Sequence, residues 1–217
     1  FAGMPLGKAL TDKVRNQWGV DLYTYTSAGH TGTAWEGQEH DGYILWEDTV
    51  LAETLDTVTG QRVGDREIGE LVATDLDNGA APYIRFRSGD IVRITQAPAP
   101  NGRTHARMWV LGRSGDEMLV AGKPVMLSEV WHFVELTPEL TDGIFQIVRY
   151  ADVMDRLRVR AGYPPDRSSG DLEDLRHRAT GALETGLGVP VDVELCPIDD
   201  LLATTSSVAK FSRVVSA

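Results

Sequence analysis

The sequence contains almost no cysteine and no excess of positive charge. The single cysteine, Cys196, excludes an internal disulfide framework and is typical of a reducing compartment. The net charge of −11 argues against a nucleic-acid partner, because a phosphate backbone attracts a field of the opposite sign. No apolar run approaches the roughly 20 residues that cross a bilayer. These absences predict a cytoplasmic protein without a nucleic-acid or membrane partner.

The composition is that of a chain that folds. Apolar residues make up 42% of the 217 residues and charged residues 24%, which excludes wholesale disorder. The first residues, Phe1 to Leu6, resemble the middle of a strand and a turn. We therefore expect that they were cut from a longer protein.

The first half of the chain has the pattern of an antiparallel β structure. A helix is predicted at residues 11–18, where apolar positions at helical spacing precede Gly19. Thr59-Gly60 and Asn78-Gly79 supply turn signals between apolar runs. Strands are predicted at residues 43–46, 51–55, 68–73, 83–86, 91–95 and 106–111. This series predicts a curled sheet or a distorted barrel.

Beyond Gly112 the pattern changes to mixed α and β. A hairpin is predicted at residues 118–125, a helix at 128–136 with Ser128 as its N-cap, and an amphipathic helix at 171–185. Strands are predicted at 144–148, 156–160 and 189–195. The fold class is therefore α+β, with a boundary at Gly112-Arg113 and domains at residues 1–112 and 113–217.

Three segments have residue types that could carry chemistry. The first, residues 84–90, is predicted to be a strand that enters a Ser-Gly turn before Asp90, which would either cap its own backbone or bind a vicinal diol. The second, residues 112–122, is either a polar turn or an interdomain joint in which Gly115 supplies backbone freedom. In the third, residues 209–214, Lys210 taken alone is a solvated charge.

Together these segments resemble the phenylacetate-CoA ligase family of adenylate-forming enzymes. Residues 23–27 match the family's YGxSE-type segment, and residues 34–48 keep Glu36, Gly42 and Asp48 of the following stretch. Residues 59–60 and 68–74 match the TGE and GELVxT hairpin. Residues 85–90 match RYRTGD, and residues 112–122 match GRSDDMLIIRG with equal spacing. The resemblance covers nearly the whole chain.

The resemblance implies the carboxyl-terminal half of an AMP-forming ligase. Residues 1–112 would be the β-rich, barrel-like part of the large domain, and residues 113–217 a mobile lid domain. Asp90 and Arg113 would hold the ribose, Tyr23 would flank adenine, and Thr26 would bind the phosphate. Gly115 and Asp116 would form the hinge, and Lys210 would stabilise charge during adenylation. ATP, Mg²⁺, CoA and a carboxylic acid, with an aryl or arylacetic acid as the guess, are the implied ligands.

The sequence departs from the family in three ways. Ser27 stands where a Mg²⁺-binding glutamate is expected, which leaves Glu36 as a substitute, and Thr24 replaces a glycine. Relatives have Cys, His and Cys-x-Cys at positions 37, 44, 98 and 100, where this chain has Gly37, Ile44, Pro98 and Pro100, so no structural zinc is expected. The phosphate-cradling loop should precede Phe1, and this chain alone should not be a competent ligase.

Several alternatives stay open at this point. The chain could belong to an active ligase, to a nucleotide-binding relative that lost turnover with Ser27, or to an adenylating enzyme with a non-CoA acceptor. A scaffold or oligomerisation role, including a homodimer, is a further alternative.

Overall fold

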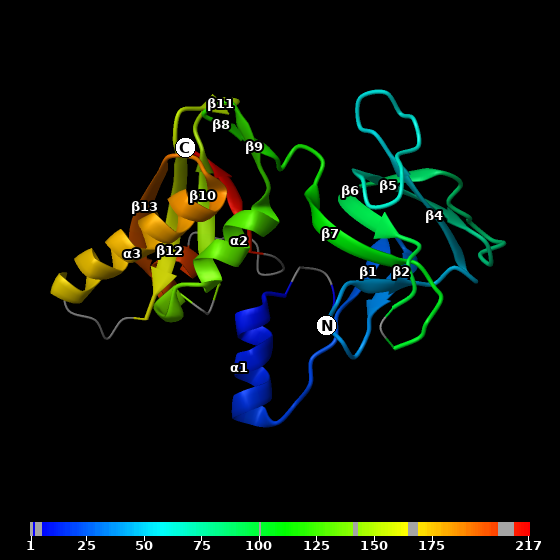
Figure 1. The fold of residues 1–217 in the computed structure, drawn as a ribbon, viewed down its shortest axis with the longest axis horizontal. Helices are drawn as coiled ribbons and strands as arrows, with labels where there is room; N and C mark the ends of the chain where they lie inside the picture. Colours follow the sequence, from blue (N-terminus) through cyan, green and yellow to red (C-terminus); the bar gives the residue numbers. More distant parts are fainter. Residues whose placement is uncertain (1, 3–5, 100, 141–142, 165–168, 204–210) are drawn as a thin grey trace. The chain divides into compact units, whose positions relative to one another are not determined.

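The computed structural model describes residues 2, 6–99, 101–140, 143–164, 169–203 and 211–217 (Figure 1). Contacts within the chain separate it into two compact units. Asp21–Ser114 belongs to the first unit, and Leu6–Val20 with Gly115–Ala217 forms the second. The domain boundary expected at Gly112-Arg113 stays a prediction. The amino-terminal helix, expected in the first domain, groups with the second unit instead.

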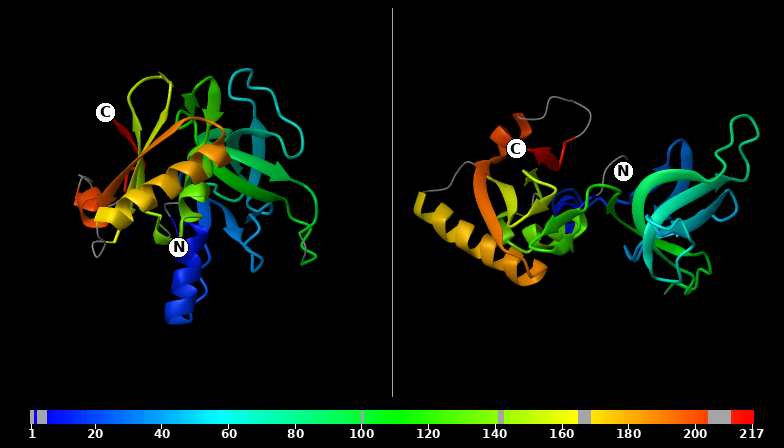
Figure 2. Two further views of the ribbon diagram at one scale, coloured as in Figure 1. Left: turned by 60° about the vertical axis from the view of Figure 1, so that its left-hand side comes forward. Right: turned by 90° about the horizontal axis from the view of Figure 1, so that it is seen from above.

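The first unit is built on one seven-stranded sheet in which neighbouring strands are antiparallel. Its strands are β1 (Tyr25–Ala28), β2 (Thr31–Glu36), β3 (Tyr43–Leu45), β4 (Val50–Leu55), β5 (Ile68–Asp75), β6 (Phe86–Thr95) and β7 (Arg107–Arg113). The spatial order is β1-β2-β3-β7-β6-β5-β4. Figure 2 shows that the long strands of this sheet bend strongly.

The core of the first unit combines side chains from several strands of the sheet. Leu71 and Ala73 on β5 share it with Val92 on β6 and Met108 on β7, all fully buried. Leu71 and Ala73 are alternate positions on β5, so their side chains point to the same face of the sheet. Burial of this apolar face is the main driving force for the curled sheet.

The structure corrects the prediction around the Ser-Gly sequence. The separate strand predicted at residues 83–86 is wrong, because one strand, β6, runs through Ser88 and Gly89 without a turn. Gly89 has a φ of 76°, and the pairing of β6 with β7 shifts register between Ile91 and Val92. The segment is thus an irregular, bulged strand, in which glycine supplies the left-handed conformation that a side chain disfavours.

The second unit contains a four-stranded sheet covered by helices. The sheet has the order β13 (Val191–Pro197), β12 (Leu157–Tyr163), β10 (Phe145–Arg149) and β14 (Val214–Ser216). A smaller sheet contains β11 (Val153–Met154), β8 (Met118–Val120) and β9 (Lys123–Val125). The helical segments are α1 (Lys8–Trp18), α2 (Leu127–Glu135), η1 (Pro138–Leu140), α3 (Ser169–Leu187) and α4 (Ile198–Ala203).

Helices α2 and α3 lie on one face of the four-stranded sheet (Figure 1). Leu175, Ala179 and Leu183 of α3 are buried at helical spacing, which confirms the predicted amphipathic helix. They join Trp131 of α2 and Phe145 of β10 in one core. The N-cap prediction for α2 is wrong by two residues.

Met126 is the N-cap of α2, and its backbone N–H donates to Glu129 Oε2 at 2.8 Å. Ser128 therefore lies within the first turn. A glutamate three residues into a helix can reach back to the N-cap backbone, and this contact decides where α2 begins.

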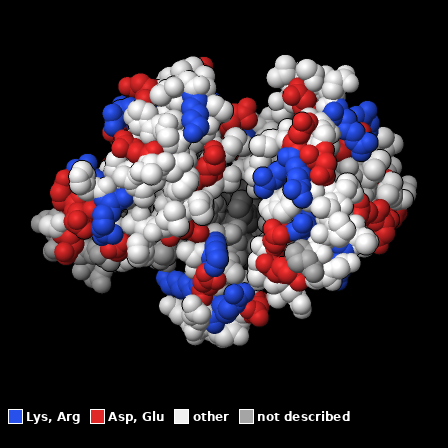
Figure 3. Space-filling view, viewed as in Figure 1, with Lys and Arg blue, Asp and Glu red and all other residues white. Residues whose placement is uncertain are grey.

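The described surface carries both signs of charge. On the face shown in Figure 3, Asp and Glu side chains alternate with Lys and Arg over each unit. No helix among the described residues is long and apolar enough to span a membrane.

Candidate nucleotide site

Asp90 and Arg113 lie opposite each other on two paired strands. They are register partners in the β6–β7 ladder, and Arg113 Nη1 lies 3.2 Å from Asp90 Oδ1. Arg113 Nη2 also donates to the Ser88 carbonyl oxygen at 3.0 Å. The Asp90 side chain is 14% exposed and the Arg113 side chain 57%. The pair offers a carboxylate acceptor beside a guanidinium donor, the combination that can bind a vicinal diol.

The backbone that carries Asp90 is fixed by a carboxylate on the neighbouring strand. Glu70 of β5, with a side chain only 6% exposed, forms an ion pair with Arg87 and accepts the Gly89 N–H at 3.2 Å. The hydrogen bonds and the negative charge of Glu70 raise the pKa of the Arg87 guanidinium. On β7, the other neighbour of β6, the chain continues into Ser114, whose N–H donates to the Gly89 carbonyl oxygen at 2.6 Å.

Space around Gly89 is also limited. A Cβ atom at this position would lie 3.0 Å from Arg113 Nη2. Glycine therefore satisfies both the positive φ and the close approach of the arginine. The local sequence of β6 is thus what brings Asp90 and Arg113 together.

A second group of contacts surrounds Tyr23, the residue expected to flank adenine. Its ring stacks on His40 with centroids 5.2 Å apart and planes 8° apart, and the residue is 39% exposed. Glu36 Oε2 accepts the Thr24 N–H at 2.9 Å and the Thr24 hydroxyl at 3.0 Å, while Glu36 Oε1 lies 3.0 Å from His40 Nδ1. Glu36 therefore contacts both Thr24, which follows Tyr23 in the chain, and His40, which stacks on the Tyr23 ring.

The hydroxyl of Tyr43 belongs to the same group. It lies 3.0 Å from Thr24 Oγ1, and burial together with the negative charge of Glu36 raises its pKa. The hydrogen bond with Thr24 lowers the pKa of Tyr43 and so opposes these two effects. Thr24, which replaces a family glycine, thus uses its hydroxyl to link Glu36 with Tyr43.

Thr26 and Ser27 follow on β1. Thr26 pairs with Ala34 of β2, and the register shifts between Thr26 and Ser27. Thr26 is half-buried and Ser27 is exposed. The β1 irregularity thus lies between the two positions for which the resemblance implies phosphate and Mg²⁺ roles.

The expected hinge residues lie where the two units divide. Gly115 has a φ of 88°, and its carbonyl oxygen accepts a hydrogen bond from Arg149 Nη1 at 2.9 Å. No described heavy atom would lie within 4 Å of a Cβ atom at Gly115. Asp116 follows in the segment before β8 and is half-buried. Lys210, the expected catalytic residue, lies outside the described residues.

Sequence relatives agree on one family. No protein-family model matches the chain. A phenylacetate-coenzyme A ligase of Thermus thermophilus is 30% identical over 176 residues, 74% of this chain and 40% of that protein. One from Aromatoleum evansii is 29% identical over 201 residues, 90% of this chain and 45% of that protein. The chain belongs to the phenylacetate-CoA ligase family. It spans less than half the length of these relatives.

A solved structure extends this family assignment to the fold. A crystal structure of 2-hydroxyisobutyryl-CoA ligase in the postadenylation state, in complex with R3-HIB-AMP, matches 96% of this chain and 45% of that protein. The TM-score is 0.84 at 26% sequence identity. The mixed α and β architecture of this ligase-family chain is therefore that of adenylate-forming CoA ligases.

Sequence reasoning missed Glu70 and His40, which organise this part of the first unit. Glu70 is a charged residue inside the apolar run Ile68 to Ala73, and such an interruption signals a buried ion pair. His40 carries no comparable signal. It comes into contact with Tyr23 only because β2 and the following turn fold back on the segment before β1.

Proposed function

We propose that this chain is part of an AMP-forming ligase that activates a carboxylic acid with ATP and transfers the acyl group to CoA. The observation that carries this proposal is the Asp90–Arg113 pair, which occupies the family's RYRTGD and GRSDD positions on adjacent strands. The names of the relatives support an acid-CoA ligase reaction. An aryl or arylacetic acid is the substrate class that the named sequence relatives favour.

In this proposal the first unit holds the nucleotide. The Asp90 carboxylate accepts hydrogen bonds from the two ribose hydroxyls, and Arg113 keeps that carboxylate in place. Tyr23 flanks the adenine, with His40 supporting its ring. The hydroxyl of Thr26 donates to the adenylate phosphate. Each role uses a group that the geometry leaves at least partly accessible to a ligand.

The reaction requires positioning and positive charge more than a general base. A carboxylate oxygen attacks the α-phosphorus and pyrophosphate leaves; then the CoA thiolate attacks the acyl carbon and AMP leaves. Lys210 stabilises the negative charge that accumulates in the first step, a contribution of about 10²–10³ in rate. We further propose that the second unit is a lid that rotates about Gly115 and Asp116 between the steps.

The residues of the first unit do not fit a protein-held Mg²⁺ site. Both oxygens of Glu36 already contact Thr24 or His40, and Ser27 offers only a neutral hydroxyl. Among the described residues, no group of three or more His, Cys, Asp and Glu could hold a metal. The proposed reaction therefore uses no cation that the protein itself holds, and any Mg²⁺ enters with the phosphates of ATP.

We also propose that the chain has no structural zinc. Ile44 is buried near Gly37, where a Cβ atom would lie 3.1 Å from Ile44 Cδ1. Arg107 forms an ion pair with Asp41, and Asn101 Nδ2 donates to Glu39 Oε2 at 2.9 Å. Apolar packing and these polar contacts would replace the metal crosslink of relatives; Pro100 lies outside the described residues. Elemental analysis should find substoichiometric zinc, whereas one zinc per chain would refute this proposal.

Pyrophosphate exchange tests the proposed ligase activity. The full-length protein should exchange labelled pyrophosphate into ATP in the presence of one acid of a broad panel, and Lys210→Ala should reduce this exchange about 10²–10³-fold while the protein stays folded. Asp152→Asn, which removes an exposed carboxylate of the second unit, is the control and should change nothing. Absence of exchange with every acid would contradict the proposal.

A second candidate is a relative that binds nucleotide without turnover. The observation that favours it is the exposed Ser27 at the position of the family's Mg²⁺-binding glutamate. Calorimetry would then show AMP binding without pyrophosphate exchange, and Ser27→Glu should restore exchange. If the acyl adenylate forms but CoA does not discharge it, the acceptor is a carrier protein or an amine instead.

A further inference from the structure

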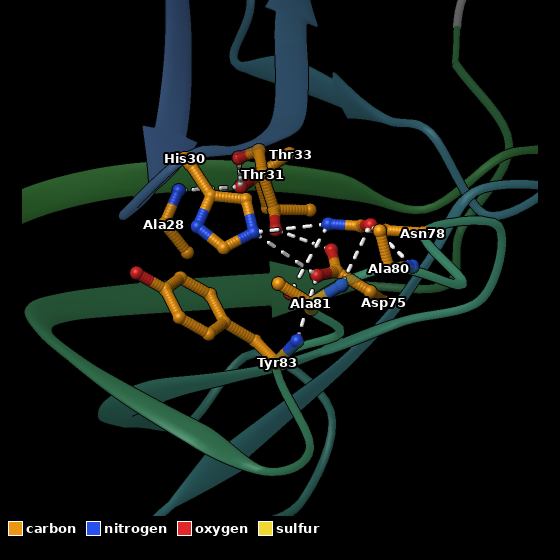
Figure 4. Close-up of polar contacts among 9 residues, drawn as sticks. All are labelled: Ala28, His30, Thr31, Thr33, Asp75, Asn78, Ala80, Ala81 and Tyr83. Carbon is orange, nitrogen blue, oxygen red and sulfur yellow. Dashed lines mark hydrogen bonds and ion pairs between the residues drawn. The ribbon is translucent and has the colours of Figure 1, made fainter.

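A second polar cluster lies in the first unit and has no role in the proposed ligase reaction. Asp75 ends β5, and its side chain is only 2% exposed. The Thr31 hydroxyl donates to Asp75 Oδ1, and the Tyr83 N–H donates to Asp75 Oδ2 at 2.8 Å. His30 Nε2 lies 3.5 Å from Asp75 Oδ2 (Figure 4). These contacts lower the pKa of Asp75, so its carboxylate is ionised at neutral pH.

The cluster borders an open-sided cavity of about 220 Å³. Two acidic residues, the buried Asp75 and the exposed Asp77, line this cavity together with the half-buried Trp46. The polar part of the cavity lining also includes His30, Thr31 and Asn78. Neither lysine nor arginine lines the cavity in the part of the chain that the structure describes. Asp90, Arg113 and Tyr23 are absent from its lining.

The orientation of the Asn78 amide determines which hydrogen bond His30 Nε2 makes. Asn78 Oδ1 accepts the N–H groups of Ala80 and Ala81 at 3.3 Å, which leaves Nδ2 to face the imidazole. Nδ2 lies 3.1 Å from His30 Nε2 (Figure 4). With Nε2 accepting this hydrogen bond, it does not donate to Asp75. The carboxylate of Asp75 accepts hydrogen bonds from the Thr31 hydroxyl and the Tyr83 N–H.

This arrangement gives the cavity a negative potential. A shielded carboxylate interacts more strongly with a nearby charge than an exposed one does, because water screens it less. Asp77 adds to the same potential. A cation that enters the cavity therefore gains from both carboxylates. A cation with an alkyl part also gains from Trp46, because an aromatic face attracts a positive charge.

We propose that this cavity binds a small organic ammonium ion, whose charged nitrogen faces Asp75 and Asp77 and whose alkyl part lies against Trp46. A metal ion is the less suitable occupant, since the described residues form no group of three or more acidic, histidine or cysteine ligands. The aromatic wall favours a ligand that is both cationic and apolar. Binding here is independent of the proposed nucleotide site.

Titration of the full-length protein with n-butylammonium chloride tests this inference. Heteronuclear NMR should show saturable shifts of the Trp46 indole N–H and of the His30 ring. Butan-1-ol, which has the same alkyl chain without the charge, should bind at least about tenfold more weakly, because the charge interaction is lost. Equal responses to the two probes would overturn the proposal.

Variants separate the contributions of charge and ring. Asp77→Asn, an exposed change that preserves the fold, should weaken butylammonium binding about 3- to 10-fold, and Trp46→Leu about 3-fold. Asp152→Asn should leave it unchanged, as should added AMP. Unchanged affinity in both Asp77→Asn and Trp46→Leu, or saturable binding of Ca²⁺ in preference to the ammonium ion, would refute the assignment. Loss of AMP binding alone would count only against the nucleotide site.

Discussion

Arg213 shows how a single buried cation can hold a chain segment in the second unit. Its guanidinium carbon lies 3.6 Å from the centroid of the Trp131 ring and 4.7 Å from that of Phe145. Arg213 Nη1 also donates to the Gly143 carbonyl oxygen. Burial lowers the pKa of Arg213 to about 10, so the group remains protonated at neutral pH. The residue follows Lys210 by three positions, immediately before β14, and anchors the described segment that comes next.

Replacing Arg213 by leucine should therefore destabilise the protein. The substitution removes cation–π contacts and leaves a buried carbonyl without its donor, and we expect a loss of about 2–4 kcal/mol in the free energy of unfolding. Urea denaturation measures this change. The matched control is Arg158→Leu, since Arg158 lies 4.2 Å from the Tyr150 ring centroid but is exposed. An equal effect of the two substitutions would contradict the assigned importance of burial.

Asp75 makes a pH-dependent contribution to stability. Hydrogen bonds from Thr31 and Tyr83 lower its pKa in the folded state. A carboxyl group with a lowered pKa stabilises the fold above its unfolded pKa of about 3.9, and this stabilisation is lost as the pH falls further. Asp75→Asn should thus show a smaller decrease of Tm between about pH 6 and pH 3 than the unsubstituted protein. Parallel Tm curves of the two proteins would show that Asp75 does not contribute.

At the scale of elements, the irregular strand β6 decides whether the nucleotide site forms. Glu70→Gln removes the charge that pairs with Arg87 and that accepts the Gly89 N–H. We expect a loss of about 1–3 kcal/mol in unfolding free energy and a roughly tenfold weaker binding of AMP, because the backbone before Asp90 is less well fixed. Glu53→Gln is the control: Glu53 pairs with Arg85 on the same sheet but does not contact Gly89.

The two readouts separate stability from site geometry. Equal effects of Glu70→Gln and Glu53→Gln on AMP binding would show that Glu70 does not position Asp90. A stability loss confined to Glu70→Gln without a change in AMP affinity would lead to the same conclusion.

The sequence predicted the regular elements better than the irregular ones. The α3 helix and the β10–β12 strand pair follow from apolar spacing, and the structure confirms both. Strands β1 and β2 were missed, since residues 25–36 are rich in Thr, Ser and Gly and lack an apolar alternation. The strand β6 was divided in two because Ser-Gly is a common turn signal, whereas here contacts with Glu70 keep the segment in the sheet.

At the scale of the whole molecule, the chain consists of a sheet-based unit and an α+β unit joined at Ser114 and Gly115. The sequence motifs correctly identified the family, since phenylacetate-coenzyme A ligases match 74% and 90% of the chain at 30% and 29% identity. The proximity of Asp90 and Arg113 could be expected from adjacent strands. The contacts of Glu36 with Thr24 and His40 could not, since they depend on how the turn before β3 folds back.

The proposed ligase function depends most on the binding of a ribose diol by Asp90 and Arg113. Isothermal titration of the full-length protein with AMP and with 2′,3′-dideoxy-AMP tests it directly. We predict that AMP binds about 10- to 100-fold more tightly, because only AMP can donate two hydroxyl hydrogen bonds to the carboxylate, and that Asp90→Ala abolishes the difference. Equal affinity for the two nucleotides, or a difference that persists in Asp90→Ala, would contradict the account.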